Sequence, residues 1–232
     1  MILLLLSLVG CPAEDLGVQL PVGGIDAMTN EDLKRDVWSL SRPPMEDRRV
    51  GQPGHEVGLA FIEKRLISMK TLPAFRDARQ PAGEGVNLCT VQKGQSQEHI
   101  LLTTMDSGVG AYESASGISG LISLAKSLNG KKRPPHSLLF CVIAGEQGWG
   151  QFESNPPVPL ATIRAWFELG PLGLEGALKE ESVAVAGKTK RLFHSGLSSK
   201  AERPGQKDDL DFRVLLSQLR EIYAKIQEEL ER

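Results

Sequence analysis

The chain lacks an excess of charge of either sign, and it lacks internal repeats and long low-complexity tracts. Its 27 basic and 29 acidic residues give a net charge of −2, and no basic run is interleaved with aromatic residues. Nothing in this pattern points to a nucleic-acid partner. The hydrophobic content of 41% and charged content of 24% are ordinary for a globular protein. A length of 232 residues is enough for one sizeable α/β domain.

Long apolar runs are also scarce, and the one at the N-terminus stands apart. Residues 1–9 are almost purely apolar and are followed by Gly10 and Cys11. Nine residues are too few for a membrane-spanning helix, but they fit the apolar core of a signal peptide. The run Leu8-Val9-Gly10-Cys11 resembles a bacterial lipobox, which implies cleavage before Cys11 and a diacylglyceryl group on its thiol.

We therefore expect a lipoprotein signal peptide over residues 1–11, a tether over 12–28 and a single domain over 29–232. A lipidated Cys11 would anchor the protein to a membrane of the bacterial cell envelope, on the periplasmic or outer-membrane face. No Lys or Arg precedes Leu3, where a signal peptide carries positive charge. A basic stretch encoded upstream would explain this. The alternative is a short apolar N-terminus that packs in a core.

Hydrophobic periodicity predicts helices and strands in alternation. Thr29 and Asp32 have capping-box spacing at the start of a first helix. Further helices are expected over residues 55–70, 116–128 and 209–232, and strands over 86–91, 99–103, 137–144 and 163–167. Strands and helices in βαβ order predict an α/β fold with three α/β/α layers around a mixed, mainly parallel sheet.

Cys89 and Cys141 are the two cysteines of the expected mature domain, and both lie in apolar runs that indicate strands. Buried strand thiols behave as small hydrophobic residues more often than as metal ligands. A disulfide between them remains an open alternative.

Chemistry in parallel sheets takes place just past the carboxyl ends of the strands, so the segments after Thr103 and Ala144 are the first candidates for a site. The two segments read Thr104-Met105-Asp106-Ser107, continued by Gly110-Ala111-Tyr112-Glu113-Ser114-Ala115-Ser116-Gly117, and Gly145-Glu146-Gln147-Gly148-Trp149. They resemble the co-catalytic di-zinc aminopeptidase family (peptidase family M-28), which usually has His-x-Asp-Ser, Gly-Ala-x-Asp-x-Ala-Ser-Gly and Glu-Glu-x-Gly-Leu. The resemblance covers about residues 29–170 well and the tail loosely.

The resemblance implies zinc as the cofactor, but several ligand positions hold other residues. Two zinc ions need His and carboxylate ligands, and a nearby Glu must take a proton from the bound water. The first His ligand falls on Thr104, whose hydroxyl is a poor zinc ligand. Asp106 takes the place of the Asp that orients that His. The bridging Asp falls on Glu113 and a later Asp ligand on Glu168, each one methylene longer.

The paired glutamates of the family are reduced to one. If Gly148 matches the family glycine, Glu146 keeps the ligand position and Gly145 replaces the general base. In the other alignment, Glu146 is the base and Gln147 replaces the ligand. Neither alignment keeps both functions.

The last family ligand is a His near the C-terminus, for which His194 is the candidate. It follows Glu168 after a shorter interval than the family normally has, which implies a shortened C-terminal part; a core or solvent-facing His is the other interpretation. Three carboxylates with at most one His suit a hard cation better than zinc. The alternative is that Glu113, Glu146 and Glu168 are ordinary acids at strand ends.

Two functions compete at this point. The first is an envelope lipoprotein whose aminopeptidase-like domain is inactive and serves in binding a peptide or protein or in assembly, with zinc absent or weakly bound. Thr104 and Gly145 favour it. The second is an active metallo-aminopeptidase that hydrolyses N-terminal residues of peptides with a rearranged metal site, and the retained carboxylates favour it. A glutaminyl-cyclase-like transferase, which shares the fold, is a third.

Overall fold

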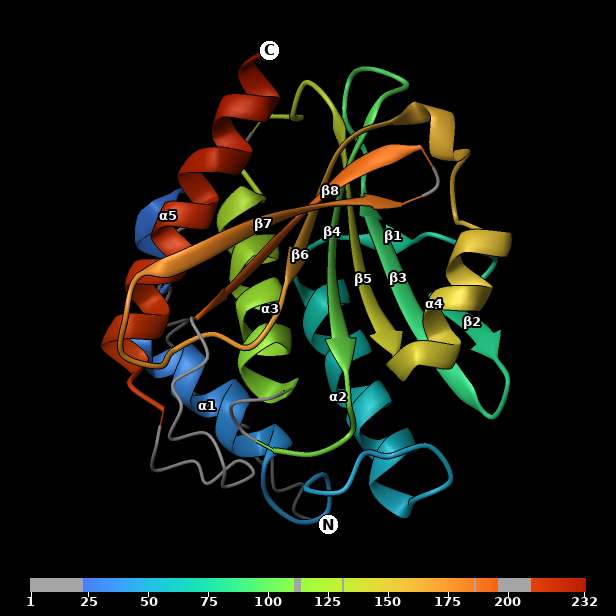
Figure 1. Ribbon diagram of the computed structural model, residues 1–232, viewed down its shortest axis with the longest axis vertical. Coiled ribbons are helices and arrows are strands. Elements are labelled where there is room, and N and C mark those ends of the chain that lie inside the picture. The colour runs from blue at the N-terminus through green and yellow to red at the C-terminus, as the bar shows by residue number, and fades with distance from the viewer. Residues whose placement is uncertain (1–22, 111–113, 131, 186, 196–209) are drawn as a thin grey trace, which may run out of the picture.

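The protein is built around one eight-stranded sheet (Figure 1). The computed structural model describes residues 23–110, 114–130, 132–185, 187–195 and 210–232. The strands are β1 Leu72–Pro73, β2 Arg79–Ala82, β3 Gly85–Gln92, β4 His99–Asp106, β5 Ser137–Ala144, β6 Ile163–Leu169, β7 Leu178–Val185 and β8 Lys188–Ser195. The helices are α1 Asn30–Leu40, α2 Pro53–Ser68, α3 Ser116–Leu128, α4 Gly145–Ser154 and α5 Phe212–Glu231, with short 3-10 helices at Ile25–Ala27 and Leu160–Thr162.

The strand order is β1-β3-β5-β4-β6-β8-β7, and β2 pairs with β3 as well. Strands β5, β4, β6 and β8 run parallel to one another. The strands on either side, β3 and β7, run antiparallel to their neighbours. The sheet is therefore mixed with a parallel centre, which confirms the predicted fold class. The carboxyl ends of β4, β5 and β6 consequently lie at the same edge, where a site is expected.

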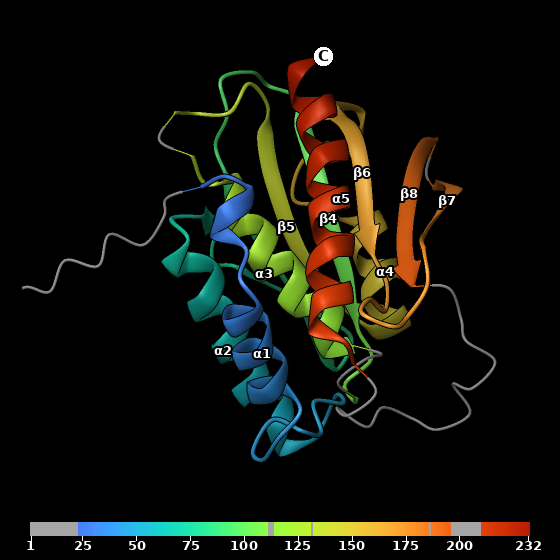
Figure 2. The same ribbon diagram turned by 90° about the vertical axis from the view of Figure 1, so that its left-hand side faces the viewer.

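Helices α1, α2, α3 and α5 cover one face of the sheet, and α4 covers the other (Figure 2). Strand β5 shows why both faces need cover, because all eight of its residues are buried. Successive side chains of a strand point to opposite faces. Leu138 and Phe140 accordingly pack with the four helices, whereas Leu139 and Cys141 pack on the α4 side. None of the described helices is both long and apolar enough to cross a membrane.

Each predicted helix and strand is present, with differences at the ends, and the structure adds β1, β2, α4, β7 and β8, which were not predicted. Thr29 caps α1, where its hydroxyl accepts a hydrogen bond from the Asp32 amide at 3.2 Å. Helix α2 begins earlier than predicted, at Pro53, because proline suits the first helical position. Strand β7 was not predicted, since most of its residues are exposed and it lacks an apolar alternation. The expected signal peptide, Cys11 and most of the tether lie outside the described residues.

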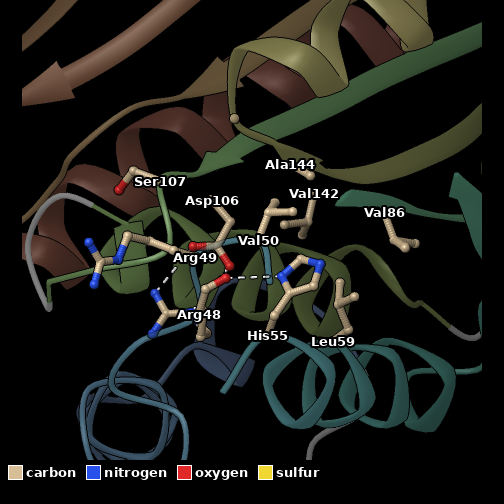
Figure 3. A pocket seen from close by; sticks show the side chains of 11 residues that line it. Arg48, Arg49, Val50, His55, Leu59, Val86, Asp106, Ser107, Val142 and Ala144 are labelled. Carbon is tan, nitrogen blue, oxygen red and sulfur yellow. Dashed lines mark hydrogen bonds and ion pairs between the residues drawn. The ribbon is translucent and has the colours of Figure 1, made fainter. Parts of the chain in front are cut away.

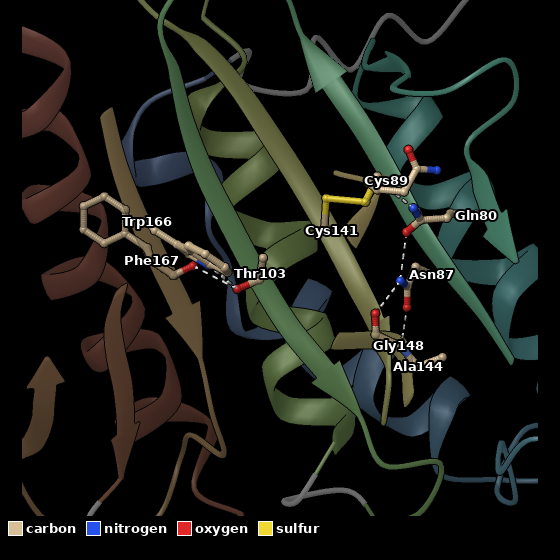
Figure 4. The surroundings of a disulfide bond; sticks show 10 residues. Gln80, Asn87, Cys89, Thr103, Cys141, Ala144, Gly148, Trp166 and Phe167 are labelled. Atoms are coloured by element: carbon tan, nitrogen blue, oxygen red, sulfur yellow. Dashed lines mark hydrogen bonds between the residues drawn. A yellow bond between two sulfur atoms is a disulfide. The ribbon is translucent and has the colours of Figure 1, made fainter. Parts of the chain in front are cut away.

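Cys89 on β3 and Cys141 on β5 form a disulfide, which settles the alternative that the sequence left open (Figure 4). The two residues are direct partners in the antiparallel β3–β5 ladder, with Cα atoms 4.2 Å apart. Both are fully buried. The bond therefore fastens the outer antiparallel part of the sheet to its parallel centre.

Candidate functional site

Asn87 fixes the turn by which β5 enters α4, at the expected site edge. Its Oδ1 accepts a hydrogen bond from the Ala144 amide at 3.0 Å, and its Nδ2 donates to the Gly148 carbonyl at 2.8 Å (Figure 4). Between these two contacts, Gly145 has a φ of 59°, in the left-handed region that favours glycine. The turn thus places Glu146 in the first turn of α4.

The conformation of this turn bears on the family's paired glutamates. A Glu at position 145 would have to adopt the left-handed backbone conformation, which costs roughly 1–2 kcal/mol for a residue with a Cβ. Glycine is therefore the residue that the backbone conformation at position 145 favours. Glu146 is exposed and makes no hydrogen bond or ion pair with the described residues. Its carboxylate stands alone rather than as one of a pair.

Asp106, at the end of β4, is bound by a buried arginine. The Arg48 side chain is 1% exposed and its Nε lies 3.2 Å from Oδ2 of Asp106, while its Nη2 lies 3.3 Å from Oδ1. The Ser114 hydroxyl and the Gly108 amide also donate to Oδ1. Asp106 takes the place of the family Asp that orients a His ligand, but Thr104 stands where that His would be, and the carboxylate is the centre of a structural network.

Thr104, in the position of the first family His, faces α3. Its side chain is buried, at 1% exposure, and its hydroxyl donates to the Leu169 carbonyl at 2.9 Å. Gly117 of α3 packs so closely that a Cβ there would lie 2.5 Å from Oγ1 of Thr104. The Thr104 hydroxyl is thus enclosed between α3 and the sheet, and its hydrogen bond is made to the neighbouring strand β6.

Replacing Gly117 by Ala is expected to destabilise the protein by about 1–3 kcal/mol, because the added methyl overlaps Thr104 and little there can move. Urea unfolding monitored by circular dichroism measures the change. Thr104→Ala removes the overlapping atoms, so the double variant should lose less stability than the two single variants added together. Simple additivity of the two losses would show that α3 does not press on Thr104.

Glu168, in the position of a later family Asp, points to the opposite side of the sheet from Thr104. In the parallel β4–β6 ladder, Thr103 pairs with Glu168, and Thr104 pairs with Leu169. Leu169 packs with the helices α1, α2, α3 and α5, whereas Trp166 packs on the α4 side and donates from Nε1 to the Thr103 hydroxyl at 3.1 Å (Figure 4). By strand alternation Glu168 shares the α4 side, so one ion cannot contact both ligand positions.

Lys190 of β8 neutralises the Glu168 carboxylate, with Nζ 2.5 Å from Oε2. Both side chains are largely buried, at 14% and 12% exposure. The ammonium group also lies 4.6 Å from the centre of the Trp149 ring and 5.7 Å from that of Trp166, within cation–π range. Lys190 could not be singled out from the sequence, because β8 was not predicted.

His194, the candidate for the last ligand, lies on β8 and is held by its neighbours. Its Nε2 lies 3.2 Å from a carboxylate oxygen of Glu181 on β7, and its Nδ1 lies 3.0 Å from the Ser195 carbonyl oxygen. Both ring nitrogens are therefore engaged within the hairpin.

The described residues contain no group of three His, Cys, Asp or Glu side chains that could hold a metal ion. Glu113, the candidate for the bridging ligand, lies outside them. Thr104 and Glu168 face opposite sides of the sheet, and Glu168 and His194 each have a protein partner. The described donor set does not fit a di-zinc centre, which needs convergent ligands around two neighbouring ions.

A small pocket opens at the same edge, between α2 and the ends of β4 and β5 (Figure 3). Its volume is about 100 Å³. The wall is mainly apolar and includes Val50, Leu59, Val86 and Val142. The polar groups on it include His55. The sequence does not single out this residue, because it is one of many polar residues on a predicted helix.

No protein-family model matches the chain, and no curated protein matches its sequence. Solved structures match its fold. A glutaminyl cyclase of Porphyromonas gingivalis has a TM-score of 0.69 at 14% identity, over 87% of this chain and 98% of that one. An aminopeptidase from Aneurinibacillus sp. strain AM-1 has a TM-score of 0.67 at 9% identity, over 88% and 95%.

A Zn-dependent exopeptidase from Parabacteroides distasonis has a TM-score of 0.67 at 11% identity, over 88% of this chain and 99% of that one. Identities this low speak for the fold alone. The fold implied by the segments after Thr103 and Ala144 is thereby confirmed. The chain has the α/β/α fold of the glutaminyl cyclase, the aminopeptidase and the Zn-dependent exopeptidase that it matches.

Proposed function

We propose that this chain is a non-catalytic, lipid-anchored protein of the bacterial cell envelope whose aminopeptidase-like domain binds a peptide or protein ligand. The division of the family's ligand positions between two sides of the sheet carries the proposal. Thr104 is enclosed against α3, and Glu168 is paired with Lys190 on the α4 side. A centre that activates water needs both positions to converge on one metal cluster.

The loss of the second glutamate supports the same proposal. Activation of a metal-bound water needs a general base beside the ligand carboxylate. Gly145 has no side chain to act as that base, and its left-handed backbone suits glycine. In the other alignment Glu146 is the base, but Gln147 then stands where a carboxylate ligand is needed. Either way one function is missing.

The proposed location draws support from the disulfide. Disulfides persist in oxidising compartments such as the periplasm and the cell surface, and they are rare in the reducing cytosol. The buried Cys89–Cys141 bond is therefore consistent with export, as is the lipobox-like sequence that ends at Cys11. Cys11→Ser should move the protein from the membrane fraction to the soluble fraction of cells. An unchanged membrane fraction would contradict the lipid anchor.

The proposed ligand class rests on the structural neighbours, two of which are named as an aminopeptidase and an exopeptidase and so act on peptide ends. A domain that keeps their fold while losing the reaction would bind peptide without cleaving it.

The activity assay uses the full-length protein purified in detergent, an aminoacyl chromogenic substrate and matched reactions with and without added zinc. We expect no more turnover than Glu146→Ala shows under the same conditions, because the described residues hold no convergent metal site. Zinc-dependent turnover that Glu146→Ala abolishes would overturn the proposal in favour of an active metallo-aminopeptidase. Cyclisation of an N-terminal glutamine by the same samples would favour the transferase instead.

A further inference from the structure

His55 is the polar centre of the pocket between α2 and the ends of β4 and β5. The residue is 8% exposed, and its Nδ1 lies 3.0 Å from the carbonyl oxygen of Arg48 (Figure 3). A carbonyl oxygen can only accept, so Nδ1 carries the hydrogen. The other nitrogen, Nε2, is buried and has no hydrogen-bond partner among the described residues.

This arrangement defines what a ligand must offer. When Nδ1 donates, the neutral imidazole presents a lone pair at Nε2. Buried polar atoms in folded proteins nearly always have a partner. A partner for Nε2 of the neutral ring therefore lies outside the described residues and must donate a hydrogen bond.

The walls set the size and polarity of the rest of the ligand. The pocket has a volume of about 100 Å³ and is lined by Val50, Leu59 and Val86, among others. A dry cavity of roughly 150 Å³ takes one benzene molecule, so this pocket takes a group of about four or five heavy atoms. Its walls favour an aliphatic group over a polar one.

The charged groups around the pocket are already paired, which argues against a charged ligand. Arg48 is bound to Asp106, with Nε 3.2 Å from Oδ2. Arg49, whose side chain is 61% exposed, is bound to Asp47 at 2.7 Å. An ionic ligand would enter an apolar pocket without a free counter-charge, at a high desolvation cost.

We propose that this pocket binds a small branched aliphatic group that carries one hydroxyl. The hydroxyl donates to Nε2 of His55, and the aliphatic part packs on Val50, Leu59 and Val86. Two sources offer this chemistry: the side chain of a threonine in a peptide, and a free small alcohol. No bond is made or broken, and the inference does not depend on whether the protein binds a metal or cleaves peptides.

The test uses NMR of the full-length protein in detergent with methyl-labelled valine and leucine. N-acetyl-threonine amide is compared with N-acetyl-valine amide, which has the same shape without the hydroxyl. Isobutanol is compared with its isomer diethyl ether, which cannot donate. We expect saturable shifts of the Val50, Leu59 and Val86 methyl signals, and roughly tenfold tighter binding of the donor in at least one pair, because the analogue leaves Nε2 unpaired.

The two pairs separate the sources of the ligand. A preference for threonine over valine amide identifies a peptide side chain. Saturation by isobutanol without any response to the amides identifies a free alcohol. Equal affinities within both pairs, or no saturable shift with any of the four probes, would overturn the inference.

Two variants of His55 connect the preference to Nε2. His55→Asn keeps an amide near the position of Nδ1, where it can donate to the Arg48 carbonyl, but has no atom in place of Nε2. We expect it to bind donor and non-donor equally. His55→Gln places an amide near Nε2 and should keep part of the preference. If His55→Asn fails to fold, Leu59→Phe, which narrows the pocket, should abolish the shifts, and unchanged binding by Leu59→Phe would contradict the proposed location.

Discussion

Replacing Arg48 by Met is expected to destabilise the fold by about 3–5 kcal/mol, which is typical when one partner of a buried ion pair is removed. The Arg48 guanidinium bonds to Asp106 and to the Ser114 hydroxyl, at 3.0 Å, and it also donates to the carbonyls of Leu40 and Met45. Methionine fills a similar volume without any donor. The Asp106 carboxylate, only 11% exposed, would then lack its counter-charge.

The neighbouring arginine is the matched control. Arg49 is 61% exposed, and its ion pair with Asp47 lies at the surface, where such pairs contribute about 0–1 kcal/mol. Arg49→Met should therefore leave the urea midpoint almost unchanged. Adding Asp106→Asn to Arg48→Met removes the uncompensated charge and should recover part of the loss. Equal effects of Arg48→Met and Arg49→Met would contradict the buried network.

Removal of the disulfide is expected to have the second-largest effect. Cys89 and Cys141 are separated by 52 residues. Cross-linking a loop of that length stabilises a fold by about 2–4 kcal/mol, mainly by restricting the unfolded chain. The double variant Cys89→Ala/Cys141→Ala should lose about that much in urea unfolding under oxidising conditions.

Reduction of the native protein provides the control. The reduced protein keeps both sulfur atoms but loses the bond. The difference in unfolding free energy between the reduced protein and the double alanine variant therefore measures the packing of the sulfur atoms alone. Most of the loss should appear on reduction. Free thiols at Cys89 and Cys141 in the native protein after denaturation without reductant would show that the bond is absent.

The interior of the fold could be predicted from the sequence, and its edges could not. The run 137–144 is apolar throughout because β5 is buried on both faces, and α3 has a strong helical stripe. Strands β7 and β8 form the edge hairpin, where most β7 side chains face solvent. Their pairing depends on contacts with each other rather than on a hydrophobic pattern.

The position of the site could be predicted from the sequence, but the contacts and orientations of its side chains could not. The ends of β4 and β5 do lie together, with Asp106 and Gly145 both lining one pocket. The partner of Asp106, however, is Arg48, which is 58 positions away along the chain. The register that sets Glu168 beside Thr103 rather than Thr104 is a property of strand pairing. A single sequence does not contain that register, so the opposite orientation of Thr104 and Glu168 could not be foreseen.

The scaffold of the domain and the side chains at its expected site differ in what they share with the matching structures. The fold of this chain is shared with solved structures such as the Aneurinibacillus aminopeptidase. In this chain Asn87 holds the turn between β5 and α4, and α3 packs closely against β4. Three side chains at positions that the resemblance assigns to the site make structural contacts: Asp106 binds Arg48, Thr104 donates to the Leu169 carbonyl, and Glu168 pairs with Lys190. These contacts stabilise the fold without a metal.

The absence of a di-zinc centre is measured by elemental analysis of the full-length protein, after equilibration with excess zinc and removal of unbound ions. We expect far less than one zinc per chain, with no difference between the native protein and Glu146→Ala. One or two zinc ions per chain, held through desalting and lost in Glu146→Ala, would contradict it.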